Sequence, residues 1–230
     1  MKKVVVFGDE FGLKKLVSSI KEFNIEIAAI VYSEKRKQAY QTAQTISQDL
    51  GCTLLKHPLK KNEKEYNRFV ATLNDFDADL GICFSYDMIL PQDILNQFKM
   101  GVYNLHGALL PKYRGANVLN WVVINGEEQT GMTLHKMSSK VDQGPIALQK
   151  IVNIDFKDTA VTLRNKLNLA AEKLLLDFWK LFLEDKIVLK EQDEKDATYV
   201  ERRKPEDGLF DWSQDAKDIY NLVRALVHPW

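Results

Sequence analysis

The chain has 230 residues, which is enough for one substantial core or for one domain with a small extension. Its composition, 45% hydrophobic and 28% charged, is typical of a globular protein, and no apolar run approaches the roughly 20 residues that span a bilayer. Because 32 basic residues balance 32 acidic ones, the chain lacks the basic excess with which proteins usually bind a phosphate backbone. We therefore expect a cytoplasmic protein that binds neither nucleic acid nor a membrane.

Short apolar runs alternate with amphipathic stretches in the first half of the chain. Compact runs rich in valine and isoleucine indicate buried strands, and apolar residues spaced three and four apart indicate helices. This alternation is typical of an α/β fold with a Rossmann-like open sheet, mostly parallel, and helices on both faces. The strands are expected at 3–7, 26–32, 53–55, 79–84 and 101–105, and the helices at 13–20, 39–50 and 66–76.

The loop after the first strand reads Gly-Asp-Glu-Phe-Gly from Gly8 to Gly12. It lacks the G-x-G-x-x-G spacing of dinucleotide-binding loops, so a dinucleotide cofactor is not supported. Amides at the start of the following helix favour anions, which makes Gly8, Asp9 and Gly12 candidates for substrate binding. The alternative is a tight structural turn.

The pattern changes in the second half. Two strands joined by a polar loop with Asp142 and Gly144 precede a long amphipathic helix that starts at about Thr159, with Asp158 as its N-cap. After Lys190 the chain becomes polar and charged. The ranges expected here are 132–137 and 145–154 for the two strands, 198–199 for a short strand and about 213–227 for a last helix.

Polar side chains gather where the strand at 101–105 ends. A strand places Asn104 and His106 on one face, and ligands of open α/β sheets bind beyond the carboxyl ends of the strands. An amide and an imidazole side by side can stabilise an oxyanion, and a carboxylate such as Asp142 favours the protonated imidazole. This trio suits acyl transfer to a substrate amine, which needs no Ser or Cys nucleophile. The alternative for His106 is a purely structural role.

The stretch from Asn104 to Gln149 resembles the 10-formyltetrahydrofolate-dependent formyltransferases. The matching motifs are N-L-H-G-A-L-L-P-K-Y-R-G at 104–115, N-W-x-x-x-N-G-E at 120–127, T-G-M-T-L-H at 130–135 and D-Q-G at 142–144. The likeness implies that Asn104, His106 and Asp142 are the catalytic residues. The sequence departs from the family pattern at Ala108, where many members have Ser, and at Val118, where many have Pro.

The same likeness implies that 10-formyltetrahydrofolate is the cosubstrate and that no metal takes part. The segment Tyr-Asp-Met-Ile-Leu at 86–90 resembles the family's lining of the pterin pocket. The residues that this likeness assigns to folate binding are Tyr86, Met88, Ile89, Leu90 and, close to the pocket, His135. The alternative for His135 is a packed histidine that does not contact the folate.

Within the family, the chain is most similar to sugar-nucleotide N-formyltransferases, on Leu119-Asn120-Trp121, Thr133-Leu134-His135 and the tail from Ala197 to Trp230. The likeness implies formyl transfer to a nucleotide-linked 4-amino sugar for a surface polysaccharide such as lipopolysaccharide O-antigen. TDP-4-amino-4,6-dideoxyglucose is the first candidate and UDP-4-amino-4-deoxy-L-arabinose the nearest alternative. Methionyl-tRNA and glycinamide ribonucleotide are further alternatives, and a Rossmann-like nucleotide-binding or oxidoreductase domain is the alternative of another class.

A diphosphate in the substrate requires one or two cations. Arg114 could bind it or brace its own loop, and both interpretations stay open. Arg202 and Arg203 are adjacent, so in a strand they point to opposite faces and at most one of them faces the ligand.

The likeness covers nearly the whole chain and implies a formyltransferase domain over 1–190 with a C-terminal helical and strand extension over 191–230. Family members usually continue after a Pro-Trp pair such as Pro229-Trp230 with further strands. We therefore expect the extension to be the start of a small, truncated subdomain. Whether the protein forms a homodimer is left open.

Overall fold

The computed structural model describes residues 1–33, 35, 37–58 and 62–228, so Pro229 and Trp230 of the family motif lie outside the described residues. The chain divides into two compact units. The first unit comprises Met1–Leu105, Lys136–Ser139 and Leu175–Ile187, and the second comprises His106–His135, Lys140–Leu174 and Val188–Trp230. The division into domains over 1–190 and 191–230 stays a prediction.

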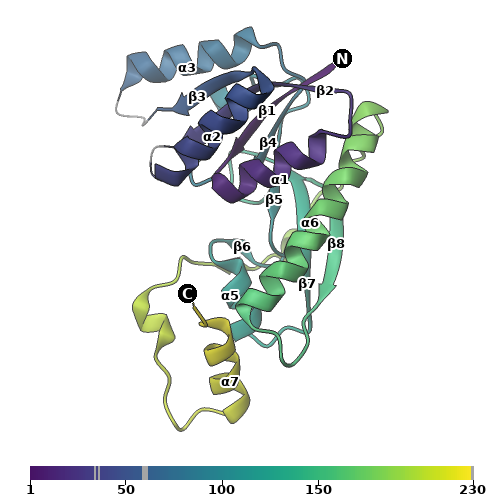
Figure 1. Cartoon of the computed structure of the whole chain (residues 1–230). Coiled ribbons are helices and arrows are strands. Elements are labelled where there is room, and N and C mark those ends of the chain that lie inside the picture. Colours follow the sequence, from purple (N-terminus) through teal and green to yellow (C-terminus); the bar gives the residue numbers. More distant parts are fainter. Residues whose placement is uncertain (34, 36, 59–61, 229–230) are drawn as a thin grey trace. The chain divides into compact units, whose positions relative to one another are not determined.

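The first unit is built on a parallel sheet whose strands run in the order β3-β2-β1-β4-β5 (Figure 1). Val4 to Phe7 of the central strand are fully buried, as expected for a strand covered on both faces. All five strands expected from the first half of the sequence form. Their bounds are β1 (Lys2–Gly8), β2 (Ile25–Ser33), β3 (Thr53–His57), β4 (Leu80–Phe84) and β5 (Val102–His106).

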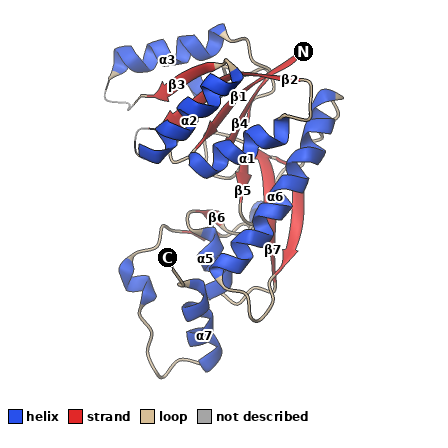
Figure 2. Cartoon of the chain, viewed as in Figure 1, coloured by secondary structure: helices blue, strands red, loops and turns tan. Residues whose placement is uncertain are grey.

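Helices cover both faces of this sheet, which confirms the predicted fold (Figure 2). The β1-β2-β3 crossovers run one way along the sheet, so right-handed connections put α1 and α2 together on one face. On the other face, Phe69 and Leu73 of α3 join Val5 and Phe7 of β1 in one apolar cluster. The bounds are α1 (Glu10–Ile20), α2 (Lys37–Leu50), α3 (Glu63–Asp75) and a short α4 (Gln92–Leu95).

The turn from β1 into α1 is tightly packed. The Asp9 carboxylate caps the helix by accepting a hydrogen bond from the Gly12 amide at 2.9 Å. A Cβ atom at Gly12 would lie 1.9 Å from the carbonyl oxygen of Phe84, so only glycine fits there. Asp9 and Gly12 thus have structural roles, and the role of Gly8, Asp9 and Gly12 in substrate binding stays a prediction.

The second unit contains an antiparallel strand pair, β7 with β8, and a two-residue parallel pair, β6 with β9. The β6–β9 pair brings Arg114 opposite Tyr199, from a segment far along the chain. Sequence analysis predicted β7, β8 and β9 but not β6. The bounds are β6 (Arg114–Gly115), β7 (Gln129–Lys136), β8 (Ile146–Asn153) and β9 (Tyr199–Val200).

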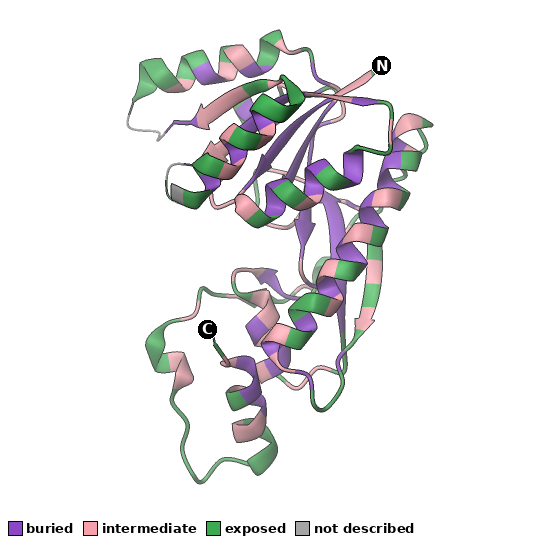
Figure 3. Cartoon of the chain, in the orientation of Figure 1, coloured by how far each residue is buried: buried purple, intermediate pink, exposed green. Residues whose placement is uncertain are grey.

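The described part of the chain contains three further α-helices. In the second unit, α5 (Val118–Ile124) packs on α7 (Ala216–Ala225), and the Asn120 side-chain amide donates to the Ala225 carbonyl at 2.7 Å. The apolar stripe predicted for α6 (Ala160–Leu183) is buried at Leu163, Leu167, Ala170, Leu174 and Phe178 (Figure 3). Across the described residues, every helix is too short or too polar to span a lipid bilayer.

The start of α6 differs from the prediction. The Thr159 hydroxyl, and not Asp158, accepts the Thr162 amide at 3.3 Å. The Asp158 carboxylate instead accepts the Asp155 amide at 2.8 Å, which closes the preceding turn. Two short 3₁₀ turns, η1 (Glu194–Asp196) and η2 (Pro205–Gly208), precede α7 in the C-terminal segment.

Candidate active site

Strand β5 carries two of the three predicted catalytic residues. Asn104 is partly buried and His106, at the strand's end, is 6% exposed. The two residues alternate with buried Leu105, so the strand presents their side chains on one face. The positions of Asn104 and His106 at the carboxyl end of a parallel strand agree with the sequence-based hypothesis.

The chain that follows β5 turns back and fixes the His106 ring. Nε2 of His106 lies 2.7 Å from the main-chain carbonyl oxygen of Tyr113. A carbonyl can only accept, so Nε2 carries the proton of the neutral ring. Tyr113 has a left-handed main chain with φ 59° and is held by a bond from its amide to the Thr198 hydroxyl at 2.8 Å. The other ring nitrogen, Nδ1, therefore lacks a proton in the neutral form.

The Asp142 carboxylate stands between two buried histidines. Its Oδ2 lies 3.5 Å from Nδ1 of His106, and its Oδ1 lies 3.5 Å from Nε2 of His135. The Gly115 amide also donates to Oδ2, at 2.9 Å. The two imidazole rings face each other edge-on with centroids 6.5 Å apart. The structure thus brings the predicted pair His106 and Asp142 together and adds His135 to them.

Charge in this cluster is set by burial and by the carboxylate. Burial alone would raise the pKa of Asp142, but the hydrogen bond with His135, the charge on His106 and the Gly115 amide lower it to about 2. Burial lowers the pKa of His106 below its usual value, although Asp142 and the Tyr113 carbonyl oppose that shift. At neutral pH the site therefore holds an ionised carboxylate beside an imidazole that can take up a proton at Nδ1.

This arrangement can move protons and stabilise negative charge. An imidazole backed by a carboxylate serves as a general acid and base, and its N–H can donate to a developing oxyanion. The described residues contain no group of three or more metal-binding side chains arranged to hold a metal ion.

The predicted folate-binding segment lies in the first unit, directly after β4. The Tyr86 hydroxyl is 2.7 Å from Nδ1 of His57, and its ring packs edge-on against Phe7. Leu90 is buried, whereas Ile89 is 77% exposed and Met88 is partly buried. An exposed apolar side chain beside an irregular segment is compatible with a ligand surface, and the role of this segment, like that of His135, stays a prediction.

The three predicted phosphate-binding arginines differ in their surroundings. Arg114 is fully buried, and protein groups accept from all of its N–H groups. Arg202 is exposed and lines a cavity of about 390 Å³ together with Trp121, Lys204 and other residues of this unit. Nε of Arg203 is buried without a hydrogen-bond partner among the described residues. Of the three, Arg202 alone lines a described cavity, and substrate binding by each stays a prediction.

Sequence analysis missed two residues that form hydrogen bonds with predicted site residues or their neighbours. Gln192 bonds to the main chain at Asp142 and Gly144, and His57 bonds to Tyr86. Neither lies in a recognisable motif: Gln192 belongs to a polar stretch, and His57 ends a short strand. Only their contacts in the folded chain identify them.

Comparison with known proteins identifies the family of this chain. Residues 2–178 match the formyl transferase family. The bifunctional polymyxin resistance protein ArnA of Wigglesworthia glossinidia brevipalpis is 44% identical over 163 residues, which are 71% of this chain and 25% of that protein. The chain thus spans about a quarter of the length of that relative.

Two examples represent the solved structures that share the fold. The N-formyltransferase of Helicobacter canadensis, in complex with folinic acid and dTDP-3-aminofucose, has a TM-score of 0.74 at 17% identity, covering 98% of this chain and 80% of that one. Glycinamide ribonucleotide transformylase 1 of Symbiobacterium toebii has a TM-score of 0.71 at 21% identity, covering 84% of this chain and 95% of that one. These identities support a common fold only. Because the family match runs over most of the sequence and the fold agrees with it, this chain belongs to the formyl transferase family.

Proposed function

We propose that this chain transfers a formyl group from 10-formyltetrahydrofolate to the primary amine of a nucleotide-linked 4-amino sugar. The observation that carries the proposal is the Asp142 carboxylate between His106 and His135, beyond the strand that holds Asn104. Family membership supports formyl transfer. The Helicobacter canadensis structure, with its folinic acid and dTDP-3-aminofucose, supports a reduced folate and a nucleotide sugar as the two ligands.

The chemistry needs a proton carrier and an oxyanion site. The neutral amine attacks the formyl carbon, a C–N bond forms, and the formyl oxygen becomes an oxyanion that Asn104 and His106 stabilise. The tetrahedral intermediate then breaks its bond to N10 of the folate. The amine loses a proton and N10 gains one, and His106, backed by Asp142, carries it.

One hydrogen bond has to change for this reaction. In the structure the Nε2–H of His106 donates to the Tyr113 carbonyl. Catalytic hydrogen bonds often reach their working geometry only when substrate binds. We therefore expect substrate to draw this N–H from the carbonyl, while Asp142 stabilises the ring through Nδ1.

The proposal also assigns residues that contact the folate and the acceptor. Tyr86, Met88, Ile89 and Leu90 are the residues proposed to contact the pterin, and His135 is a further candidate for folate binding. For the acceptor, Arg202 at its cavity meets the diphosphate. Arg203, Arg114 and the Gly8–Gly12 loop remain weaker candidates, since protein contacts surround Arg114 and the loop.

TDP-4-amino-4,6-dideoxyglucose remains the first candidate for the acceptor, within surface polysaccharide biosynthesis in the cytoplasm. UDP-4-amino-4-deoxy-L-arabinose is the nearest competitor, followed by methionyl-tRNA and glycinamide ribonucleotide. The fold does not discriminate among them, because the solved structures with this fold include both a complex with dTDP-3-aminofucose and a glycinamide ribonucleotide transformylase.

The direct test is a product assay. The purified chain is incubated with 10-formyltetrahydrofolate and each of the four acceptors, and the products are analysed by mass spectrometry. We expect the mass gain of one formyl group on a nucleotide-linked 4-amino sugar, and product formation slower by on the order of 100-fold or more with a His106→Asn variant. Absence of formylation with every acceptor would contradict the proposal, whereas formylation of another acceptor would correct the substrate and keep the chemistry.

A further inference from the structure

The side chain of Gln192 links the loop around Asp142 to the buried guanidinium of Arg114. Its Nε2 donates to the main-chain carbonyl oxygens of Asp142 and Gly144, at 2.8 and 2.7 Å. Its Oε1 accepts from Nε and Nη2 of Arg114, at 3.1 and 2.9 Å. Each end of the amide therefore meets a partner of the right kind, and the side chain has one orientation.

Arg114 is a firm anchor for this amide. The residue is fully buried, and its remaining N–H groups donate to both carboxylate oxygens of Glu194 at 3.0 and 2.8 Å and to the Tyr199 hydroxyl at 2.6 Å. Since every donor is engaged, the guanidinium cannot turn away without leaving a buried charge unpaired. The Oε1 atom of Gln192 is therefore bonded to a guanidinium whose position is fixed by its other hydrogen bonds.

The main chain at Asp142 needs such support. Asp142 has φ 54°, a left-handed conformation that residues other than glycine adopt infrequently and that the surrounding structure has to stabilise. Gln192 holds its carbonyl, and the Gly115 amide holds its Oδ2 at 2.9 Å. Gly115 directly follows Arg114 in β6, so one short segment fixes Asp142 at both ends: the carboxylate directly, and the carbonyl through Gln192.

We propose that Gln192 is a positioning residue that holds the main chain at Asp142, so that the carboxylate stays between His106 and His135. Gln192 acts through Asp142, because it holds the main-chain carbonyl of the residue whose carboxylate lies between the two histidines. The proposal also gives Arg114 a role, as the anchor of this link. Its kinetic consequence rests on the proposed formyl transfer, whereas its structural consequence does not.

The kinetic test uses Gln192→Met, which keeps the length of the side chain and removes both hydrogen-bonding ends. We expect kcat to fall by about 10- to 100-fold, the effect of a slightly misplaced catalytic group, while the KM values change little. The control is Gln129→Met, the same substitution at an exposed side chain that bonds to Asn153, which should keep the wild-type kcat. A folded Gln192→Met protein with wild-type kcat would overturn the proposal.

A second readout needs no activity. Histidine side-chain NMR, with signals assigned by His106→Asn and His135→Asn, follows the protonation of each ring. When Asp142 drifts from its place, its charge no longer supports the cation, so we expect the pKa of His106 to fall further in Gln192→Met. General loss of stability would lower the melting temperature without moving this pKa, and an unchanged His106 titration in a folded variant contradicts the proposal.

The two readouts separate the two hypotheses. If the wild-type protein formylates no acceptor, the proposed function fails, and the His106 titration still decides the role of Gln192. If Gln192→Met does not fold, Gln192→Ala carries the same tests, because water can enter the space and hydrate the guanidinium and both carbonyls without holding them in place.

Discussion

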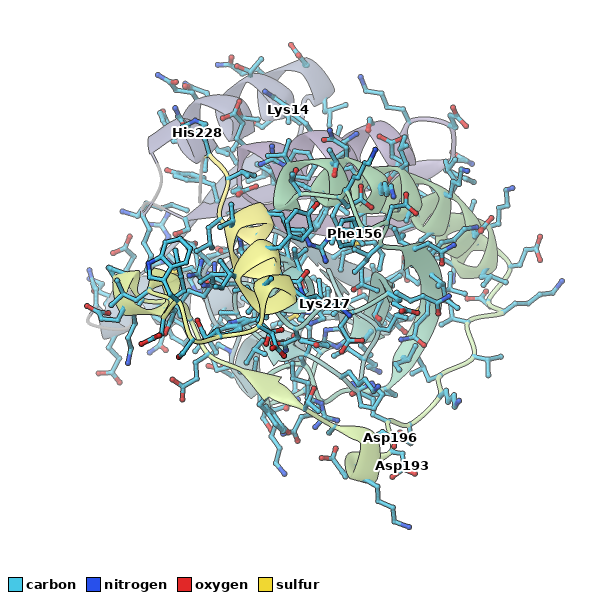
Figure 4. The ribbon with its side chains drawn as sticks, turned by 90° about the horizontal axis from the view of Figure 1, so that it is seen from below. Lys14, Phe156, Asp193, Asp196, Lys217 and His228 are labelled. Atoms are coloured by element: carbon cyan, nitrogen blue, oxygen red, sulfur yellow. The ribbon has the colours of Figure 1, made fainter. Side chains whose placement is uncertain are left out.

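At the scale of residues, the contribution of the proposed catalytic pair, His106 and Asp142, to turnover can be measured. We predict that His106→Asn and Asp142→Asn each lower kcat by on the order of 100-fold or more, because each removes a preorganised donor or its support. Steady-state kinetics at saturating substrates measures the loss, and circular dichroism verifies the fold. His228→Asn is the matched control, since His228 is exposed after α7 (Figure 4). Near-normal turnover by either site variant would remove the mechanism.

His57 gives a prediction about pH and stability. Burial lowers its pKa to about 4, a shift that Asp87 opposes and Lys35 assists. Because the unfolded histidine titrates near 6.5, the unfolded chain binds more protons between pH 6.5 and 4, and the free energy of unfolding falls as pH drops through this window. Over this pH window the titration of His57 changes the free energy of unfolding by at most roughly 3 kcal/mol.

The test compares wild type with His57→Asn, which keeps a polar side chain beside Tyr86 but does not titrate. Urea unfolding at several pH values between 7 and 4 should show a shallower decline for the variant. Parallel declines in the two proteins would mean that His57 is not held neutral in the folded state.

At this scale, the candidate site residues were found where sequence motifs contain them, and their catalytic roles stay predictions. Asn104, His106 and Asp142 lie in dense family motifs, and the structure brings His106 and Asp142 together. Gln192 could not be predicted, because a glutamine in a polar stretch has no periodicity and its partners lie far back in the chain. Arg114 was predicted to bind phosphate or to brace its loop, and its recorded contacts are those of a brace.

At the scale of elements, alternation of buried strands and amphipathic helices was sufficient to locate β1 to β5 and α1 to α3. The elements that sequence missed are short: β6, α4 and α5 carry too few residues for a periodic signal. The two-residue strand β6 forms because Arg114 and Gly115 pair with Tyr199 and Val200, which is a tertiary effect.

The segment from Tyr86 to Leu90 gives the element-scale prediction. We predict that a reduced folate slows amide hydrogen exchange in this segment, because a pterin pairs with main-chain groups and covers the exposed Ile89 side chain. Exchange is followed by mass spectrometry with and without 5-formyltetrahydrofolate. Helix α7, in the second unit, serves as the internal reference. Protection elsewhere with no change in this segment would show that the pterin binds at another place.

At the scale of the whole molecule, the net charge of the chain helps to predict which class of acceptor it binds. The formal net charge is zero, with 32 basic and 32 acidic residues. A protein that binds a nucleic acid backbone releases counterions from each neutralised phosphate, so its affinity falls steeply with salt. A nucleoside diphosphate requires far fewer cations, and the Arg202 side chain at the cavity with Trp121 and Lys204 can meet that need.

We therefore predict that the protein binds a nucleotide-linked amino sugar and not tRNA. Calorimetry with TDP- and UDP-linked 4-amino sugars should give binding that depends weakly on salt, and charged initiator tRNA should give none under the same conditions. Arg202→Gln should weaken sugar-nucleotide binding, whereas Arg68→Gln, a matched change on α3 in the first unit, should not. Formylation of methionyl-tRNA together with undetectable amino-sugar binding would overturn this acceptor and leave the formyl-transfer chemistry of His106 and Asp142 standing.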